Sequence, residues 1–269
     1  MIPRDISVSA IQSQLFWEDK EANLHMFGEK IRAISFPVDL LVLPEMFSTG
    51  FTMNAKKLAE PTDGPTLEWM QKQASSLKSV VTGSFIVNEK GNYYNRLLWV
   101  RPDGTYSHYD KRHLFRMAGE EKIYTPGEKK LIVDLHGWKV CPLVCYDLRF
   151  PAWSRNRWTK TETDLVADYD LLVYVANWPE RRVLAWKTLL VARAIENISY
   201  LVGVNRIGND GNNIFHSGDS AILDFKGASL KNAVISREEI ISENLSYQLL
   251  KEFRTGFPAG MDADEFSLA

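Results

Sequence analysis

Short apolar segments bounded by turn residues recur along the chain and predict strands. Several of them, including residues 140–144 and 171–176, are apolar at every position rather than at alternate positions. Such segments are typical of strands that are covered on both faces, as they are between helices and a second sheet. The predicted strands span residues 6–11, 40–43, 80–87, 97–100, 131–134, 140–144, 171–176, 201–204 and 221–223.

Segments with the apolar spacing of helices lie between the predicted strands. In residues 21–34, the apolar residues Leu24, Phe27 and Ile31 recur at intervals of three or four, which is typical of an amphipathic helix. Strands that alternate with helices indicate an α/β fold. The predicted helices span residues 21–34, 66–77, 182–198 and 245–253.

The chain shows no internal repeat and no long linker rich in proline, glycine or serine. We therefore predict one main domain at residues 1–258, followed by a C-terminal tail at residues 259–269. The polar segment at residues 159–168 has neither a helical nor a strand period, which predicts a loop or an irregular insertion.

Composition and charge narrow the classes of function. The 269 residues are 45% hydrophobic and 25% charged, and their net charge is −2. No block of the chain is strongly basic, so neither nucleic acid nor an anionic membrane is an expected partner. The first residues lack the apolar core of a signal peptide, and no apolar run approaches the roughly 18 residues of a membrane span. We therefore expect a cytoplasmic protein without a membrane segment.

The two cysteines of the chain, Cys141 and Cys145, lie four residues apart. If both belonged to one strand, they would lie about 13 Å apart on one face, which is too far for a disulfide. Cys145 ends an apolar segment and is followed closely by the polar residues Asp147 and Arg149. Since α/β proteins build their sites at the carboxyl ends of strands, Cys145 is a candidate nucleophile as well as a candidate core residue.

Glu45 and Lys111 extend this candidate site. Glu45 follows a predicted strand closely, and Lys111 lies in a charged cluster. Each of them alone fits a surface residue, but together with Cys145 they could catalyse acyl transfer. The thiolate is the nucleophile, and a nearby ammonium lowers its pKa and stabilises the tetrahedral oxyanion. The carboxylate moves a proton from the thiol to the leaving amine, so that no metal or other cofactor is required.

The segments around these three residues resemble the motifs of the nitrilase, or carbon–nitrogen hydrolase, superfamily. They read LVLPEMF around Glu45, YDKRHLF around Lys111 and LVCYDLRFP around Cys145, in the chain order of that family. The resemblance covers nearly the whole chain and implies a four-layer α-β-β-α sandwich that forms homodimers or larger homo-oligomers. It also implies a second glutamate that positions the lysine and the substrate, for which Glu120 is preferred and Glu121 is the alternative.

Within that superfamily, the sequence is most similar to the ω-amidases, also called 2-oxoglutaramate amidases. The similarity lies in the segments KRHLFRM, CYDLRFPAWSRN, YVANWP and ARAIEN. It implies a cofactor-free amidase that takes small ω-amides of oxo-dicarboxylates, such as 2-oxoglutaramate. The products would be the acid and ammonia, and the reaction would pass through a thioester on Cys145.

A substrate of this kind carries a free carboxylate, which requires a cation in the site. The candidate substrate-binding residues are Phe47, Arg116, Tyr146, Arg149 and Trp178. Arg149 could instead form an ion pair with Asp147, which is two residues away. The backbone N–H of Tyr146 is a candidate for the second donor of an oxyanion hole, beside the Lys111 ammonium.

The sequence alone leaves other interpretations open. A Cys–His hydrolase of the papain type would use His113 or His216 as its base, provided that one of them lies beside Cys145. A metal site is poorly supported, because five dispersed histidines and one Cys-x-x-x-Cys pattern lack ligand spacing. The chain could also hydrolyse other amides or nitriles. From a different class, it could be an inactive binding or assembly module, which the retention of Glu45, Lys111 and Cys145 disfavours.

Overall fold

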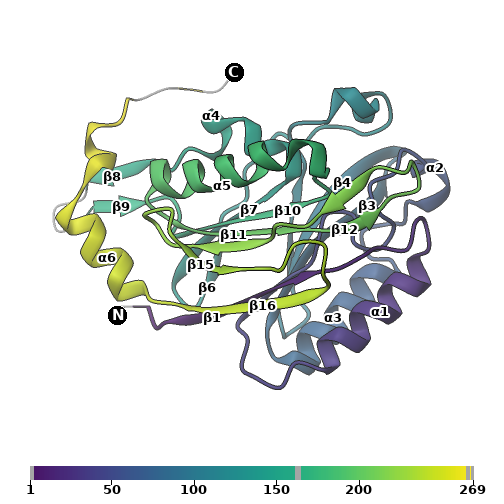
Figure 1. Cartoon of the computed structure of the whole chain (residues 1–269), viewed down its shortest axis with the longest axis horizontal. Coiled ribbons are helices and arrows are strands. Elements are labelled where there is room, and N and C mark those ends of the chain that lie inside the picture. The colour runs from purple at the N-terminus through teal and green to yellow at the C-terminus, as the bar shows by residue number, and fades with distance from the viewer. Residues whose placement is uncertain (1–2, 161–164, 265–266, 268–269) are drawn as a thin grey trace.

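The computed structural model describes residues 3–160, 165–264 and 267. In this part of the chain, two six-stranded sheets lie face to face, and helices cover the outer face of each sheet (Figure 1). The predicted α/β fold, a four-layer α-β-β-α sandwich, is therefore confirmed. Among the described helices, none combines the length and the apolar character needed to cross a lipid bilayer.

The described elements have the following bounds. The helices are α1 (Lys20–Arg32), α2 (Ala55–Leu58), α3 (Pro65–Leu77), α4 (Pro151–Ser154), α5 (Val183–Asn197) and α6 (Tyr247–Gly256). Short 3₁₀ helices span Arg116–Ala118, Glu120–Lys122, Cys145–Arg149, Glu180–Arg182 and Ala259–Asp262. The strands are β1 (Ile6–Gln12), β2 (Leu40–Val42), β3 (Val80–Glu89), β4 (Asn92–Val100), β5 (Tyr106–Asp110), β6 (Val133–Leu135), β7 (Trp138–Val144), β8 (Trp158–Lys160), β9 (Leu165–Ala167), β10 (Leu171–Ala176), β11 (Tyr200–Asn205), β12 (Ile207–Asn209), β13 (Phe215–Ser217), β14 (Ala221–Leu223), β15 (Ser229–Asn232) and β16 (Glu239–Leu245).

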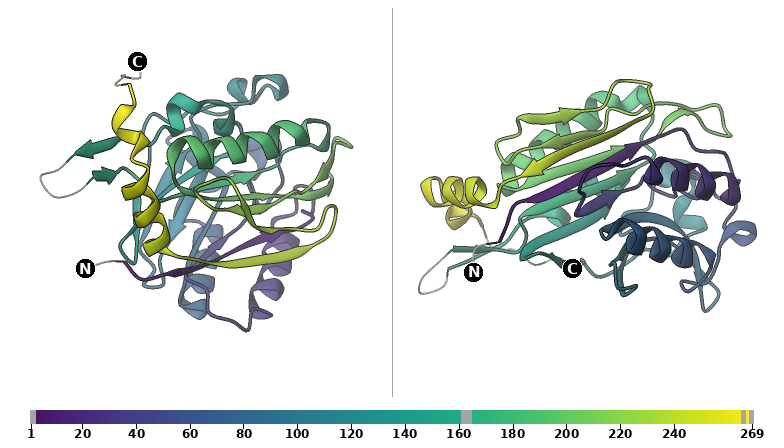
Figure 2. Two further views of the ribbon diagram at one scale, coloured as in Figure 1. Left: turned by 60° about the vertical axis from the view of Figure 1, so that its left-hand side comes forward. Right: turned by 90° about the horizontal axis from the view of Figure 1, so that it is seen from below.

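The first sheet has the strand order β16-β1-β2-β3-β4-β5, and β1, β2 and β3 are parallel to one another. Helices α1 and α3 cover its outer face (Figure 2). Helix α1 begins where the Asp19 side chain accepts a hydrogen bond from the backbone N–H of Ala22, which satisfies one free N–H group of the first turn. Phe27 and Ile31 of α1 and Met70 of α3 are buried against the sheet.

The second sheet has the strand order β15-β14-β11-β10-β7-β6, and its central strands β7, β10 and β11 are parallel. Helix α5 covers its outer face through Trp186 and Leu190, which are buried. The close approach of this helix requires Gly203 in β11, since a Cβ atom there would lie 2.7 Å from a methyl carbon of Leu190.

The main core lies between the two sheets. Val8 and Val42 from the first sheet and Leu143 and Val173 from the second are fully buried there. Because helices cover the outer faces as well, the central strands are apolar at nearly every position, as the sequence predicts. The segments that follow β2, β7 and β10 lie at the same edge of the sandwich, where parallel strands present their carboxyl ends.

Two edge strands of the first sheet are not predicted by the hydrophobic pattern. Strands β5 and β16, with the sequences YSHYD and EIISENL, form its two edges and carry several polar residues. An edge strand tolerates such residues because part of it faces water. The predicted helix at residues 245–253 is correct only from Tyr247 onward, because Leu245 is the last residue of β16.

The segment at residues 159–168, predicted as a loop or an irregular insertion, contains strand residues where the structure describes it. Strands β8 and β9 pair there as an antiparallel hairpin, and residues 161–164 lie outside the described part. The hairpin lies beside α6 (Figures 1 and 2), and the Arg254 guanidinium of α6 lies 5.0 Å from the ring centroid of Trp158. Packing against α6 thus stabilises the hairpin, whose own polar sequence has few apolar side chains to bury. The division between a main domain and a tail at residue 259 stays a prediction.

Candidate active site

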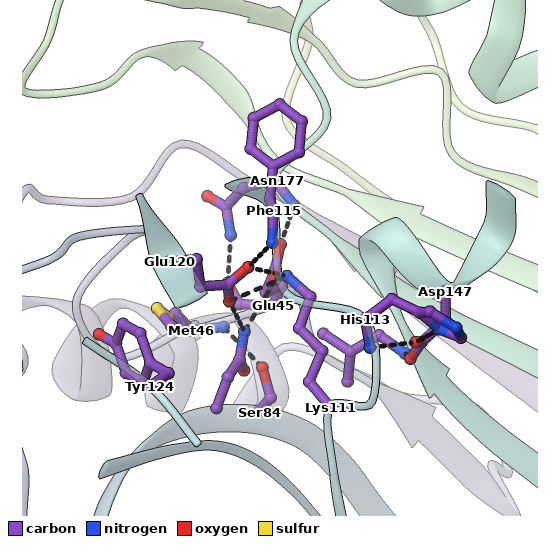
Figure 3. A network of polar contacts seen from close by, with 12 residues as sticks. Glu45, Met46, Ser84, Lys111, His113, Phe115, Glu120, Tyr124, Asp147 and Asn177 are labelled. Carbon is purple, nitrogen blue, oxygen red and sulfur yellow. Dashed lines mark hydrogen bonds and ion pairs between the residues drawn. The ribbon is translucent and has the colours of Figure 1, made fainter. Parts of the chain in front are cut away.

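Glu45 lies in the turn after strand β2 and is fully buried. One of its carboxylate oxygens accepts hydrogen bonds from Lys111 Nζ and from Asn95 Nδ2, each at 2.9 Å. The other oxygen accepts a hydrogen bond from the backbone N–H of Asn177 at 2.8 Å, and the Asn177 side chain donates to the Glu45 carbonyl. The carboxylate is therefore held in one orientation by groups from both sheets (Figure 3).

Cys145 follows strand β7 at a sharp turn. Its φ angle is +42°, in the left-handed region that residues other than glycine rarely adopt, and it begins the 3₁₀ helix Cys145–Arg149. Strand β7 ends at Val144, as the strand predicted at residues 140–144 does, so Cys145 does not share that strand with Cys141. Both thiols are free and buried. Strained residues at strand ends recur at functional sites.

Lys111 lies between two buried carboxylates (Figure 3). Its Nζ donates to Glu45 at 2.9 Å and to the two oxygens of Glu120 at 3.0 and 2.9 Å. Nζ also lies 5.1 Å from the ring centroid of Phe51, a favourable cation–π distance. Glu121 has no hydrogen bond to Lys111 in the described structure. The contacts therefore favour Glu120 over Glu121 as the second glutamate of the cluster.

The surroundings of Cys145 keep its thiol protonated in the resting protein. Burial raises the pKa of this thiol well above its usual range. The negative charge of Glu45 and its hydrogen bond with the thiol raise the pKa further, whereas the Lys111 ammonium lowers it. The expectation that the ammonium lowers the thiol pKa is thus correct for this one interaction, but burial outweighs it. If this thiol acts as a nucleophile, it would need a base to take its proton, and the Glu45 carboxylate is hydrogen-bonded to it.

The charges of the cluster are coupled. Burial by itself would lower the pKa of Lys111, but the negative charges of Glu120 and Glu45 outweigh it and raise that pKa, so the ammonium stays charged. For Glu120, burial raises the pKa, the Lys111 ammonium opposes the rise, and the charge of Glu45 adds to it. One ammonium lies between two carboxylates, so one negative charge of the buried cluster is not balanced by Lys111. The cluster can therefore accept a proton.

The three groups open onto a cavity of about 560 Å³. Glu45, Lys111 and Cys145 form part of its wall, and Tyr146 and Trp178 lie beside them. A cavity of this size suits a small-molecule substrate. Within the described ranges, no group of three or more His, Cys, Asp or Glu side chains is placed to hold a metal ion.

The predicted substrate-binding residues divide into two groups. Arg149 and Trp178 line the cavity, and the Arg149 guanidinium lies 4.9 Å from the ring centroid of Trp178 rather than against Asp147. Phe47 and Arg116 are not among the residues that line it. Phe47 is fully buried among the side chains between the first sheet and its helices, and Arg116 is exposed to solvent.

Sequence reasoning misses two residues that hold Glu45 in place, Asn95 and Asn177. Asn95 lies in β4, which the hydrophobic pattern predicts only from residue 97 onward, so no signal separates it from a surface asparagine. Asn177 follows strand β10 directly, in the same manner as Cys145 follows β7. A polar residue immediately after an apolar strand is therefore the signal that could have identified Asn177.

The histidines do not support a papain-type site. His113 makes a hydrogen bond to Asp147, with 2.7 Å between Nδ1 and the carboxylate oxygen. His216 lines the cavity, but burial lowers its pKa to about 4, and its ring hydrogen-bonds with the carbonyl of Gly208. Among the described side chains, neither histidine makes a hydrogen bond to Cys145.

Asp147 connects the Lys111 segment to the turn of Cys145. One of its oxygens accepts hydrogen bonds from the Tyr109 hydroxyl at 2.7 Å and from the Val144 N–H at 3.0 Å. The other accepts from the backbone and ring N–H groups of His113 at 3.0 and 2.7 Å. Tyr109 and His113 flank Lys111, and Val144 and Asp147 flank Cys145. The Asp147 carboxylate therefore sets the position of the ammonium relative to the thiol.

We expect Asp147→Asn to lower the free energy of unfolding by about 2 kcal/mol, because the amide can accept on one side only and leaves donors of the other side unpaired. The rate of catalysis should fall as well, since Lys111 and Cys145 lose their common support. Urea unfolding and steady-state kinetics measure the two effects. Asp134→Asn, at an exposed position of strand β6, is the control and should change neither. Equal stability of the Asp147 variant and the parent protein would contradict this account.

Comparisons with known proteins identify the family of the chain. The family model described as carbon-nitrogen hydrolase matches residues 7–255, and the chain belongs to this family. The protein is therefore a hydrolase of carbon–nitrogen bonds other than peptide bonds, and the resemblance seen in the sequence motifs is confirmed.

Individual relatives show which members of the family the chain is similar to. The chain is 43% identical to Omega-amidase YafV of Escherichia coli (strain K12) over 98% of each protein. It is 31% identical to the 2-oxoglutaramate amidase of Bacillus subtilis (strain 168), over 94% of this chain and 95% of that one. Among solved structures, it matches XC1258 from Xanthomonas campestris, a CN-hydrolase superfamily protein with an arsenic adduct in its active site. The TM-score is 0.95 and the identity is 42%, over 98% of this chain and 99% of that one.

Proposed function

We propose that this protein is an ω-amidase that hydrolyses small ω-amides carrying a free carboxylate, such as 2-oxoglutaramate and 2-oxosuccinamate, to the acid and ammonia. The observation that carries the proposal is the buried cluster in which Lys111 Nζ lies 2.9 Å from the Glu45 carboxylate, beside the thiol of Cys145 and open to the cavity. The relatives named ω-amidase and 2-oxoglutaramate amidase supply the class of substrate.

In the first half of the proposed reaction, the Cys145 sulfur attacks the amide carbon while Glu45 takes the thiol proton. Proton transfer during attack is required because the buried thiol has a raised pKa. The tetrahedral intermediate then collapses as Glu45 returns this proton to the amide nitrogen. The carbon–nitrogen bond breaks, ammonia leaves, and the acyl group stays on Cys145 as a thioester.

In the second half, water replaces ammonia. Glu45 removes a proton from a water molecule, which attacks the thioester carbon, and the carbon–sulfur bond breaks as the proton passes to the departing sulfur. The free acid leaves and the Cys145 thiol is restored. All atoms come from the amide and one water, so the cycle consumes no cofactor.

The negative charge that develops on the substrate oxygen requires donors in a dry site. The ammonium of Lys111 is our first donor, since its raised pKa keeps it charged. The backbone N–H of Tyr146 is our second, because it lies in the first turn of the 3₁₀ helix that begins at Cys145. Glu120 holds Lys111 through two hydrogen bonds and so acts as a positioning residue.

A substrate panel tests the proposal. We expect 2-oxoglutaramate and 2-oxosuccinamate to release ammonia with a kcat/KM about 10- to 100-fold above that of their methyl esters and of simple aliphatic amides. The reason is that a carboxylate bound by a cation contributes several times more than one methylene group. A clear preference for nitriles or N-carbamoyl compounds would overturn the substrate class and move the protein to another branch of its family. Equal rates on acids and esters would overturn recognition of the carboxylate.

We also propose that the protein acts in the cytoplasm as a homodimer or a larger homo-oligomer. Its two free thiols suit a reducing compartment. Helix α5 exposes Leu184 at 79% and Ile195 at 50%, so apolar side chains face outward from the layer that covers the second sheet. Apolar side chains on an outer helix favour association with another copy of the chain.

A further inference from the structure

A cluster of arginines lines the cavity that contains Cys145. Arg149 ends the 3₁₀ helix that begins at Cys145, and Arg181 and Arg182 belong to the 3₁₀ helix Glu180–Arg182, which follows strand β10. Within the described structure, none of these three side chains makes a hydrogen bond or an ion pair with an acidic residue. In the described part of the chain, no carboxylate is therefore in direct contact with these guanidinium groups.

Aromatic rings hold two of these guanidinium groups. The Arg182 guanidinium lies 5.0 Å from the ring centroid of Phe115, and that of Arg149 lies 4.9 Å from the ring centroid of Trp178. The Trp178 indole N–H also donates to the carbonyl of Arg182 at 2.8 Å. A guanidinium stacked on a ring has its orientation fixed, while the N–H groups at its edge remain available to an anion.

The acidic side chains that also line the cavity have other partners. Glu18 accepts hydrogen bonds from Thr52 at 2.6 Å and from Asn54 at 3.2 Å. Asp210 accepts hydrogen bonds from two backbone N–H groups of its own loop. Glu45 is bound to Lys111. None of these carboxylates makes a hydrogen bond or an ion pair with the arginines in the described structure.

The electrostatic surroundings of Arg182 agree with an unneutralised cluster next to the reacting sulfur. Burial lowers the pKa of Arg182, and the positive charges of Arg181 and Arg149 lower it further, whereas a charge on Cys145 raises it. Arg182 is thus close enough to sense both its neighbouring cations and the nucleophile. An anion bound there would relieve the mutual repulsion of the arginines.

We propose that Arg182 and Arg149, supported by Arg181, bind the carboxylate of the substrate while its amide lies at Cys145. The inference rests on the proposed ω-amidase function and assigns the residues that make it selective. Arg182 is the central member, since it is the more buried of the pair and is held by both Phe115 and Trp178. A guanidinium can bind a carboxylate through two parallel hydrogen bonds, which fixes the direction of the substrate chain.

The test compares Arg182→Met and Arg149→Met with the parent enzyme on 2-oxoglutaramate and on its methyl ester. We expect Arg182→Met to lower kcat/KM for the acid about 10- to 50-fold, mainly through KM, and to change that for the ester less than about threefold. Arg149→Met should give a smaller shift in the same direction. Arg237→Met, an exposed arginine that does not line this cavity, is the control and should change neither.

A binding measurement removes the dependence on turnover. In the Cys145→Ala protein, 2-oxoglutarate should bind in calorimetry, and the additional change Arg182→Met should weaken that binding about tenfold or more. If the parent enzyme hydrolyses neither substrate of the test, the proposed function fails. If it hydrolyses both, and Arg182→Met lowers the acid and the ester equally or leaves the acid unaffected, the assignment of the arginines fails while the proposed function stands.

Discussion

Replacing Cys145 by alanine is expected to lower the rate of amide hydrolysis by about 10⁴-fold or more and to leave the fold intact. The sulfur is the atom that forms the thioester, and no other described thiol faces the cavity. Cys145→Ser should be nearly as inactive, because a hydroxyl is harder to ionise than a thiol and Glu45 is too weak a base for it. Ammonia release and circular dichroism measure the two properties.

Cys141→Ala is the matched control for the nucleophile. Cys141 lies in strand β7, where burial raises the pKa of its thiol to about 12 and keeps it neutral. Its replacement should cost about 1 kcal/mol of stability and retain activity. Full activity in the Cys145 variant together with loss in the Cys141 variant would reverse the assignment. A small amide that occupies the site should slow the labelling of Cys145 by a thiol-specific probe, and an equal rate with and without the amide would mean that this amide does not bind beside the thiol.

Glu45→Gln is expected to lower kcat by between about 10²- and 10⁴-fold, because the amide keeps the shape of the carboxylate but cannot move a proton. The effect should be large here, since burial raises the pKa of the Cys145 thiol and attack depends on a base. Lys111 keeps its contacts with Glu120, so the variant should fold. Steady-state kinetics at saturating substrate measures the loss.

Glu121→Gln is the control for the acid–base assignment, because Glu121 neighbours the cluster in sequence but has no hydrogen bond to Lys111 in the described structure. It should retain the parental rate, whereas Glu120→Gln should lower it by loosening Lys111. A Glu45→Gln protein that keeps more than a tenth of the parental kcat would show that another group moves the proton. The mechanism proposed here would then be wrong, while the family membership would be unaffected.

The resting protonation state of the nucleophile could not be predicted from the sequence. The motifs place a lysine, a carboxylate and a thiol in one site, which by itself suggests a thiol with a lowered pKa. The depth of burial, which is a tertiary property, reverses that expectation. Tertiary contacts also decide the partner of Arg149, and its suggested ion pair with Asp147 is wrong. Asp147 accepts four hydrogen bonds from other residues, and the Arg149 guanidinium lies over the ring of Trp178.

The sequence by itself determined the class of the fold and the identity of the central residues. Strands such as β7 and β10 are covered on both faces, so they are apolar at nearly every position and can be recognised without knowledge of the segments that pack on them. Their predicted bounds are close to the observed ones. Cys145 directly follows β7 and Glu45 lies three residues after the end of β2, and the carboxyl ends of parallel strands gather at one edge. These are local properties that a linear pattern records.

Only the tertiary structure decided which polar residues become partners and which elements form at the edges. Strand β16 and the β8–β9 hairpin depend on pairing and packing with distant segments, so their own composition does not predict them. The cluster of Arg149, Arg181 and Arg182 likewise joins segments more than thirty residues apart, and an arginine in a sequence looks the same whether or not a carboxylate faces it. The net charge that faces a cavity depends on which charged side chains the fold brings to its wall and which of them it pairs, and both are decided only when the chain folds.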